Sequence, residues 1–189
     1  MADTHIPDRV SGLHPALLPA LQAARVERIL HAGDISSRKV IEELAQIAPV
    51  DFVRGNRDWF NQRQTGRVVQ LQFAGTPVAL MHGHISWWHY IFDKFFYISQ
   101  GYRFERYLPF LLRAGNGARV IVFGHTHHAE NIWLDGKLLF NPGSAGFGFR
   151  RVHNPSWGLL QFYADGRVEG TICVLEGYSL ENGDWRRAA

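Results

Sequence analysis

Short apolar runs in this chain stop repeatedly at a glycine or at a side chain that can bind a metal, and this recurrence constrains the fold most. Residues 120–123 run into Gly124-His125-Thr126-His127, and residues two apart on an extended segment point the same way, so the two imidazoles are expected to converge. The same pattern recurs at His82-Gly83-His84 after residues 78–81, at Gly33-Asp34 after residues 29–32, at Gly55-Asn56-Arg57-Asp58 after residues 52–54, and at Asp3-Thr4-His5. Carboxylate, amide and imidazole groups at several strand ends favour one shared polynuclear metal site.

The first third of the chain alternates between helix and strand patterns. Ser36 or Ser37 is a suitable N-cap for the second helix, which should end before Pro49. Helices are expected over residues 14–26 and 38–47, and strands over residues 28–32 and 50–54. This alternation is typical of a parallel α/β sheet.

The remainder of the chain predicts a second, largely antiparallel set of strands. Ala74-Gly75-Thr76 is a hairpin signal between two short apolar runs. Residues 92–114 are expected to be mostly helical, with an interruption near Pro109. Strands are expected over residues 67–73, 77–81, 119–123, 131–134, 137–140, 158–163 and 167–174. Two sheets packed together with helices outside, in a single domain over residues 1–189, is the expected architecture.

Composition excludes several function classes. The only cysteine is Cys173, which favours a reducing compartment, and no signal peptide pattern is visible, so we expect a cytoplasmic protein. Seventeen of the 20 basic residues are arginine, but they form no basic run, so specific nucleic-acid binding is not indicated. The aromatic stretch at residues 87–98 is too short and too polar for a transmembrane helix.

The start of the chain departs from the pattern of the other motifs. Only Met1 and Ala2 precede Asp3, whereas every other candidate metal-binding motif follows an apolar run. Either the first strand is very short or it is truncated, and the sequence leaves both alternatives open.

Taken together and in this order, the five motifs resemble the signature of calcineurin-like metallophosphoesterases. Three segments are similar to the small bacterial and archaeal phosphodiesterases of that superfamily: residues 3–7, residues 31–35 and Asn141-Pro142-Gly143-Ser144. The resemblance implies an α/β fold, a four-layer αββα sandwich of two mixed β-sheets flanked by helices. It also implies two metal ions at the strand ends, one held by Asp3, His5 and His127, the other by Asn56, His82 and His125, with Asp34 bridging them.

The donor set fits the chemistry that this resemblance implies. Mixed nitrogen and oxygen ligands without thiolates suit Mn²⁺, which we expect, or Fe, Zn, Ni or Co. Two such ions generate a hydroxide near neutral pH for in-line attack on phosphorus. We therefore expect a metal-dependent phosphodiesterase acting on a small phosphodiester or phosphoester. Asn56, which is neutral, limits the negative charge that faces an anionic substrate.

Asn56, Asp58 and His84 are expected to take part in catalysis, and Arg57 is expected to bind the substrate. Arg57 stands where many enzymes of this superfamily have a histidine that protonates the leaving group. A guanidinium stays protonated, so Arg57 is expected to bind a phosphate oxygen instead, which favours diesters with good leaving groups. Asp58 is expected to orient a ligand or a water. His84 either supports the ligands or exchanges roles with His82.

An aromatic-rich helical insert at about residues 85–115 begins at the rim of the expected site, because it directly follows His84. It is a core helix, a cap over the substrate, or a patch through which the chain forms a homo-oligomer. Two alternative functions follow from resemblances. One is a protein-binding scaffold like the retromer subunit of this fold. The other is an enzyme similar to the UDP-diacylglucosamine pyrophosphatase, which acts on a lipid-linked substrate.

Overall fold

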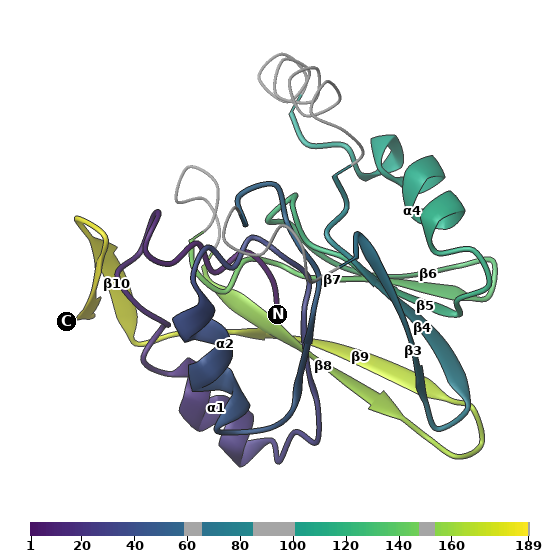
Figure 1. The fold of residues 1–189 in the computed structure, drawn as a ribbon, viewed down its shortest axis with the longest axis horizontal. Coiled ribbons are helices and arrows are strands. Elements are labelled where there is room, and N and C mark those ends of the chain that lie inside the picture. The colour runs from purple at the N-terminus through teal and green to yellow at the C-terminus, as the bar shows by residue number, and fades with distance from the viewer. Residues whose placement is uncertain (59–65, 85–100, 148–153, 189) are drawn as a thin grey trace.

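A five-stranded β-sheet and a second layer of strands lie face to face, with helices on their outer sides, in the computed structural model, which describes residues 1–58, 66–84, 101–147 and 154–188 (Figure 1). The first sheet has five strands in the order β3-β4-β5-β7-β6. Strands β4, β5 and β7 run parallel, and β3 and β6 are antiparallel edge strands. The bounds are β3 (Val68–Phe73), β4 (Thr76–Met81), β5 (Val120–Val122), β6 (Ala129–Leu134) and β7 (Lys137–Pro142). The expected hairpin joins β3 to β4.

The second layer of strands consists of two pairs with the N-terminal residues between them. Strand β1 (Ile29–His31) is parallel to β2 (Val50–Phe52), and β8 (Ser156–Phe162) is antiparallel to β9 (Val168–Val174). The N–H of Ala32 donates to the carbonyl of Met1 at 2.9 Å, and that of Ala145 donates to the carbonyl of Ala2 at 2.9 Å. Met1 and Ala2 are therefore hydrogen-bonded on both sides, although they do not form a regular strand.

Among the described residues, three apolar cores separate four layers, which confirms the expected αββα sandwich. Alternate side chains of the central strands point to opposite sides. Val120 and Val122 face the second layer of strands, while Ile121 packs with Leu111 of helix α4 (Leu108–Ala114). Helices α1 (Leu17–Ala23) and α2 (Arg38–Ala45) cover the other outer face, away from α4 (Figure 1).

The helices differ in extent from the predictions. Ser37, not Ser36, caps α2, because its hydroxyl accepts the N–H of Lys39 at 3.3 Å. Helix α1 is shorter than residues 14–26. The expected helix over residues 92–114 lies partly outside the described residues. Within them, a 3-10 turn η2 (Phe104–Arg106) precedes α4, and Pro109 lies in the first turn of α4, where its missing N–H costs nothing.

The sequence patterns did not predict a C-terminal hairpin, formed by β10 (Tyr178–Glu181) and β11 (Asp184–Arg187). Its strands are largely polar and exposed, so they lack the apolar runs that marked the other strands. Trp185 fixes it to the rest of the domain by donating its indole N–H to the carbonyl of Gly12 at 2.9 Å. Within the described residues, no helix is long and apolar enough to span a bilayer.

Candidate metal centre

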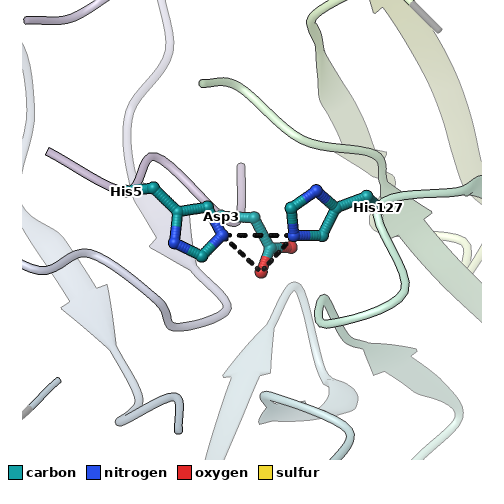
Figure 2. A group of neighbouring side chains, drawn as sticks. All are labelled: Asp3, His5 and His127. Atoms are coloured by element: carbon teal, nitrogen blue, oxygen red, sulfur yellow. Dashed lines mark hydrogen bonds and ion pairs between the residues drawn. The ribbon is translucent and has the colours of Figure 1, made fainter. Parts of the chain in front are cut away.

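Asp3, His5 and His127 bring three ligand atoms together at one edge of the sandwich (Figure 2). The Nε2 atoms of His5 and His127 are 3.1 Å apart. The Oδ1 atom of Asp3 lies 4.0 Å from Nε2 of His5 and 3.6 Å from Nε2 of His127. Asp3 and His5 come from the N-terminal segment and His127 from the loop after β5, so residues more than 120 positions apart in the sequence share this cluster.

Asn56, His82 and His125 form a second cluster beside the first. The Oδ1 atom of Asn56 is 3.0 Å from Nε2 of His82 and 3.1 Å from Nδ1 of His125. The two ring nitrogens are 3.3 Å apart. His82 follows β4 directly, Asn56 lies beyond the end of β2, and His125 lies beyond the end of β5.

Asp34 lies between the two clusters and faces each of them with a different oxygen. Its Oδ2 atom is 3.8 Å from Nε2 of His5, and its Oδ1 atom is 3.5 Å from Nε2 of His82. The Oδ1 atom also accepts the backbone N–H of Arg57 at 2.9 Å. One buried carboxylate is thus shared by both clusters.

Backbone carbonyls set the orientation of two imidazoles. Nδ1 of His127 donates to the carbonyl of Phe147 at 2.9 Å, and Nδ1 of His82 donates to the carbonyl of Ala32 at 2.7 Å. A carbonyl only accepts, so in the neutral ring the proton lies on Nδ1 and the lone pair of Nε2 faces the cluster.

Other acceptor atoms, and not donors, lie opposite these lone pairs. Nε2 of His82 faces the carbonyl oxygen of Asn56, and the buried Oδ1 atom of Asp3 has no hydrogen-bond partner among the described residues. Electron pairs that converge in this way suit a cation between them. The donors present therefore fit divalent ions of the kind that bind nitrogen and oxygen ligands.

The local backbone at the ligands is unusual. Asp3, His5, Asp34, His125 and His127 have φ between 52° and 73°, a region that residues other than glycine rarely adopt. The assumption that the two histidines of the last motif extend from a regular strand is therefore wrong. Both histidines have a left-handed backbone conformation, and their side chains belong to different clusters.

Glycines beside the candidate ligands allow the backbone to lie very close to the ligand side chains. A Cβ on Gly55 would lie 2.1 Å from Oδ1 of Asp34, and one on Gly33 would lie 2.7 Å from Nδ1 of His82. A Cβ on Gly124 would lie 2.9 Å from Oδ2 of Asp3. The glycines that end the apolar runs are therefore places where only a hydrogen fits against a candidate ligand.

Burial dominates the electrostatics of the clusters. It raises the pKa of Asp3 well above its ordinary value, and repulsion from Asp34 raises it further. Burial also lowers the pKa of His127 to about 4 and lowers the pKa of His125 well below its ordinary value. These imidazoles are consequently neutral at pH 7, the form that binds a metal.

Asp58 does not point into either cluster. Its Oδ1 atom accepts the N–H groups of Ile35 and Ser36, each at 2.7 Å, and its Oδ2 atom accepts the N–H of Gly55 at 2.8 Å. The buried carboxylate therefore ties the loop that carries Asp34 to the turn that carries Asn56.

Arg57 and His84 lie at the border of the clusters. The guanidinium of Arg57 is partly exposed and donates to the carboxylate of Asp8. His84 packs edge-on against the ring of His82, with 5.3 Å between centroids. Burial and the neighbouring His82 lower the pKa of His84 to about 3. The ligand groups described above do not include His84.

The sequence patterns missed several residues that support the ligand loops. The amide of Asn141, fully buried, donates to the carbonyl of Gly124 at 3.2 Å and to the hydroxyl of Thr126 at 3.0 Å. The hydroxyl of Ser144 donates to the carbonyl of Asp3 at 2.8 Å. Asn141 and Ser144 belong to the segment that resembles the small phosphodiesterases, but that resemblance does not indicate these hydrogen bonds.

Comparisons with known proteins identify the family of this chain. The family model described as the calcineurin-like phosphoesterase superfamily domain matches residues 1–163. A probable metallophosphoesterase of Methanothermobacter thermautotrophicus is 36% identical over 144 residues, which cover 76% of this chain and 74% of that protein.

Solved structures give the same fold. Vacuolar protein sorting 29 from Cryptosporidium parvum superposes with a TM-score of 0.71 at 23% identity, over 100% of this chain and 93% of that one. A structure described as a novel archaeal phosphodiesterase gives a TM-score of 0.54 at 20% identity, over 92% of this chain and 97% of that one. At these identities the similarity concerns the fold alone.

Proposed function

Because this chain belongs to the calcineurin-like phosphoesterase superfamily, we propose that it is a dinuclear metal-dependent phosphodiesterase acting on a small phosphodiester or phosphoester. The observation that carries this proposal is Asp34, whose two oxygens face two separate clusters of nitrogen and oxygen donors. A carboxylate shared in this way suits two divalent ions, which in two-metal hydrolases lie about 3.5–4 Å apart.

The ligand assignment follows the two clusters. Asp3, His5 and His127 would hold one ion, Asn56, His82 and His125 the other, and Asp34 both. We propose Mn²⁺ as the metal, with Fe, Zn, Ni or Co compatible with the same donors. When bound, such ions supply a water that ionises near neutral pH and neutralise charge on the phosphate.

The residues of the chain itself define which substrates fit. Asn56 contributes an uncharged oxygen, so the site faces an anionic substrate with less negative charge. We propose that Arg57, whose guanidinium pairs with Asp8 in the structure, binds a phosphate oxygen of the substrate in place of that carboxylate. Arg57 cannot act as a general acid, because its guanidinium stays protonated. These features favour diesters whose leaving groups need no protonation. The single half-buried thiol, Cys173, supports a cytoplasmic setting.

A binding scaffold of the same fold is the second candidate function, favoured by the fold similarity to vacuolar protein sorting 29. A scaffold has no need of a complete donor set, whereas every expected ligand type is present here and converges. A lipid-linked pyrophosphate substrate is a third candidate, but residues 85–100 of the aromatic insert lie outside the described residues. Comparing hydrolysis of lipid-linked and nucleotide diesters separates this candidate from the first.

The test is hydrolysis of bis-p-nitrophenyl phosphate with added Mn²⁺. We expect Asp34→Asn to lower kcat by about a hundredfold or more, because loss of the shared carboxylate weakens the binding of the two ions that would stabilise transition-state charge. Asp51→Asn, which changes only a surface ion pair with Arg28, should leave the rate unchanged. Folded protein that binds metal yet turns over no diester with any of the five metals would contradict the proposal and favour the scaffold.

A further inference from the structure

Tyr102, which is not a candidate metal ligand, packs against the loop that carries His125 and His127. We call this loop, residues 124–128, the histidine loop. Tyr102 lies just before η2, and its ring stacks face to face on the imidazole of His128, with 3.9 Å between centroids and 8° between planes. The residue that follows His127 is therefore covered by an aromatic ring from another part of the chain.

The hydroxyl of Tyr102 also reaches the histidine loop. It donates to Oε1 of Glu130 on β6 at 2.9 Å and hydrogen-bonds the hydroxyl of Thr126. Oγ1 of Thr126 already accepts the side-chain amide of Asn141 at 3.0 Å and the N–H of His128 at 3.3 Å, so its proton is available to the phenol oxygen. Burial and the neighbouring Glu130 raise the pKa of Tyr102, so the phenol keeps the proton that it donates.

These contacts form one directional hydrogen-bond chain between β7 and β6. The amide of Asn141 donates to Thr126, and Thr126 donates to Tyr102. Tyr102 in turn donates to Glu130. Asn141 and Glu130 are themselves cross-strand partners in the ladder between β6 and β7. The chain therefore starts and finishes on two paired strands, and it ties Thr126 to a regular part of the sheet.

The residues on both sides of Thr126 have costly backbone conformations. The φ angle is 73° at His125 and 59° at His127. Such conformations persist only where the surrounding contacts fix them. Tyr102 contacts the residue before His127 through its hydroxyl and the residue after it through its ring. It therefore helps to fix the backbone on both sides of this candidate ligand.

His125 has further supports of its own. Its N–H donates to Oδ2 of Asp3 at 3.0 Å, and the ring of Tyr107 packs edge-on against its imidazole, with 6.5 Å between centroids. Loss of the Tyr102 hydroxyl should consequently disturb His127 more than His125.

We propose, resting on the proposed function, that Tyr102 is a positioning residue for one of the two metal ions. It would hold the histidine loop so that Nε2 of His127 lies beside Asp3 and His5. The hydroxyl of Tyr102 acts through Thr126, and its ring acts through the imidazole that follows His127. The centre thus depends on a side chain that lies outside all five ligand motifs.

The test is calorimetric titration of the metal-free full chain with Mn²⁺, as wild type and as Tyr102→Phe. This substitution keeps the ring on His128 and removes only the hydroxyl. We expect one of two binding steps to weaken by about tenfold, the smaller loss typical when a group that orients a metal ligand is removed. His5→Ala should weaken the same step and so identify its ion. In protein loaded with Co²⁺, the visible absorption of that ion should shift as well.

Matched variants separate positioning from general stability. Tyr163→Phe removes the same kind of bond, a tyrosine hydroxyl that donates to Glu169 at 3.0 Å, and should leave both binding steps unchanged. Glu130→Gln keeps an acceptor for Tyr102 and should bind Mn²⁺ as the wild type does, whereas Glu130→Ala should weaken the step that Tyr102→Phe weakens. Combining Glu130→Ala with Tyr102→Phe should add little further loss, because both variants break the same bond.

The outcomes distinguish this proposal from the proposed function. If the wild type binds two ions and both steps are unchanged in Tyr102→Phe, the positioning role is overturned and the dinuclear centre stands, even where that variant unfolds at a lower urea concentration. A loss confined to the step that His5→Ala leaves intact overturns it too. If the wild type binds fewer than two ions, the dinuclear centre itself is contradicted, and the role of Tyr102 with it.

Discussion

The hydrogen bonds of Asp58 lead to a quantitative prediction about the metal-free protein. Its buried carboxylate accepts three backbone N–H groups, two from the loop after Asp34 and one from Gly55. In Asp58→Asn, the amide oxygen can serve the two N–H groups of that loop, but the amide nitrogen then faces the N–H of Gly55. One buried donor loses its acceptor, which costs about 1–3 kcal/mol. In a chain of this size, a loss of about 2 kcal/mol lowers Tm by about 4–8 °C.

Asp58→Ala should be worse, since all three N–H groups lose their acceptor at about 1 kcal/mol or more each. The assay is urea unfolding in EDTA, so that no metal contributes to the measured free energy. Asp51→Asn is the matched control, because it removes only a surface ion pair whose contribution is about 0–1 kcal/mol. The prediction is contradicted if the free energy of unfolding of Asp58→Asn lies within about 0.5 kcal/mol of the wild-type value, which is the range of ordinary surface substitutions. In that case Asp58 does not hold the two loops together.

Three further predictions concern the centre itself. Gly55→Ala places a Cβ 2.1 Å from the shared carboxylate and should abolish Mn²⁺ binding in calorimetry, whereas Gly12→Ala, in open space, should bind normally. Asp8→Asn removes the ion pair between Asp8 and Arg57 and should lower KM for a diester, and an unchanged KM would argue against phosphate binding by that guanidinium. Asp3 has a raised pKa, so its proton stabilises the metal-free fold below the ordinary carboxyl pKa, and this contribution is lost as pH rises through the raised pKa. In EDTA, urea unfolding of Asp3→Asn should lack this loss, and Mn²⁺ should stabilise this variant less than the wild type, because only one of the two clusters loses a ligand.

The central strands were predictable because their burial leaves a direct mark in the sequence. Strand β5 is buried on both faces, and its residues read as an uninterrupted apolar run. Helix ends were less predictable, because local contacts determine them. Residues 14–16 precede α1 as a turn in which Nδ1 of His14 accepts the N–H of Ala16 at 3.2 Å. The hairpin of β10 and β11 has few buried apolar residues, so no periodic pattern marked it.

The candidate site was predictable in its residue types but not in its geometry. Apolar runs that end in Gly-Asp or in His-x-His identify side chains at one edge of the sandwich, and the structure brings all seven together. Which atom each side chain presents depends on the backbone. His125 presents Nδ1, while His82 presents Nε2 because its Nδ1 donates to a carbonyl 50 residues away. Contacts of this kind, like those of Asn141, involve residues distant in the sequence and leave no local pattern.

Without a bound metal, the candidate ligands destabilise the folded state in several ways at once. The same residues stand out in the sequence because they are locally unfavourable at strand ends. Asp3 and Asp34 are buried carboxylates that repel each other, and five candidate ligands adopt backbone conformations that are costly for residues other than glycine. A sequence selected for stability alone would have apolar or turn-forming residues at these strand ends. Side chains in positions that lower the stability of the fold are expected only if a bound group offsets this loss of stability. The same local conflict that marks the motifs in the sequence therefore supports a cationic occupant between the clusters, independently of any similarity to known proteins.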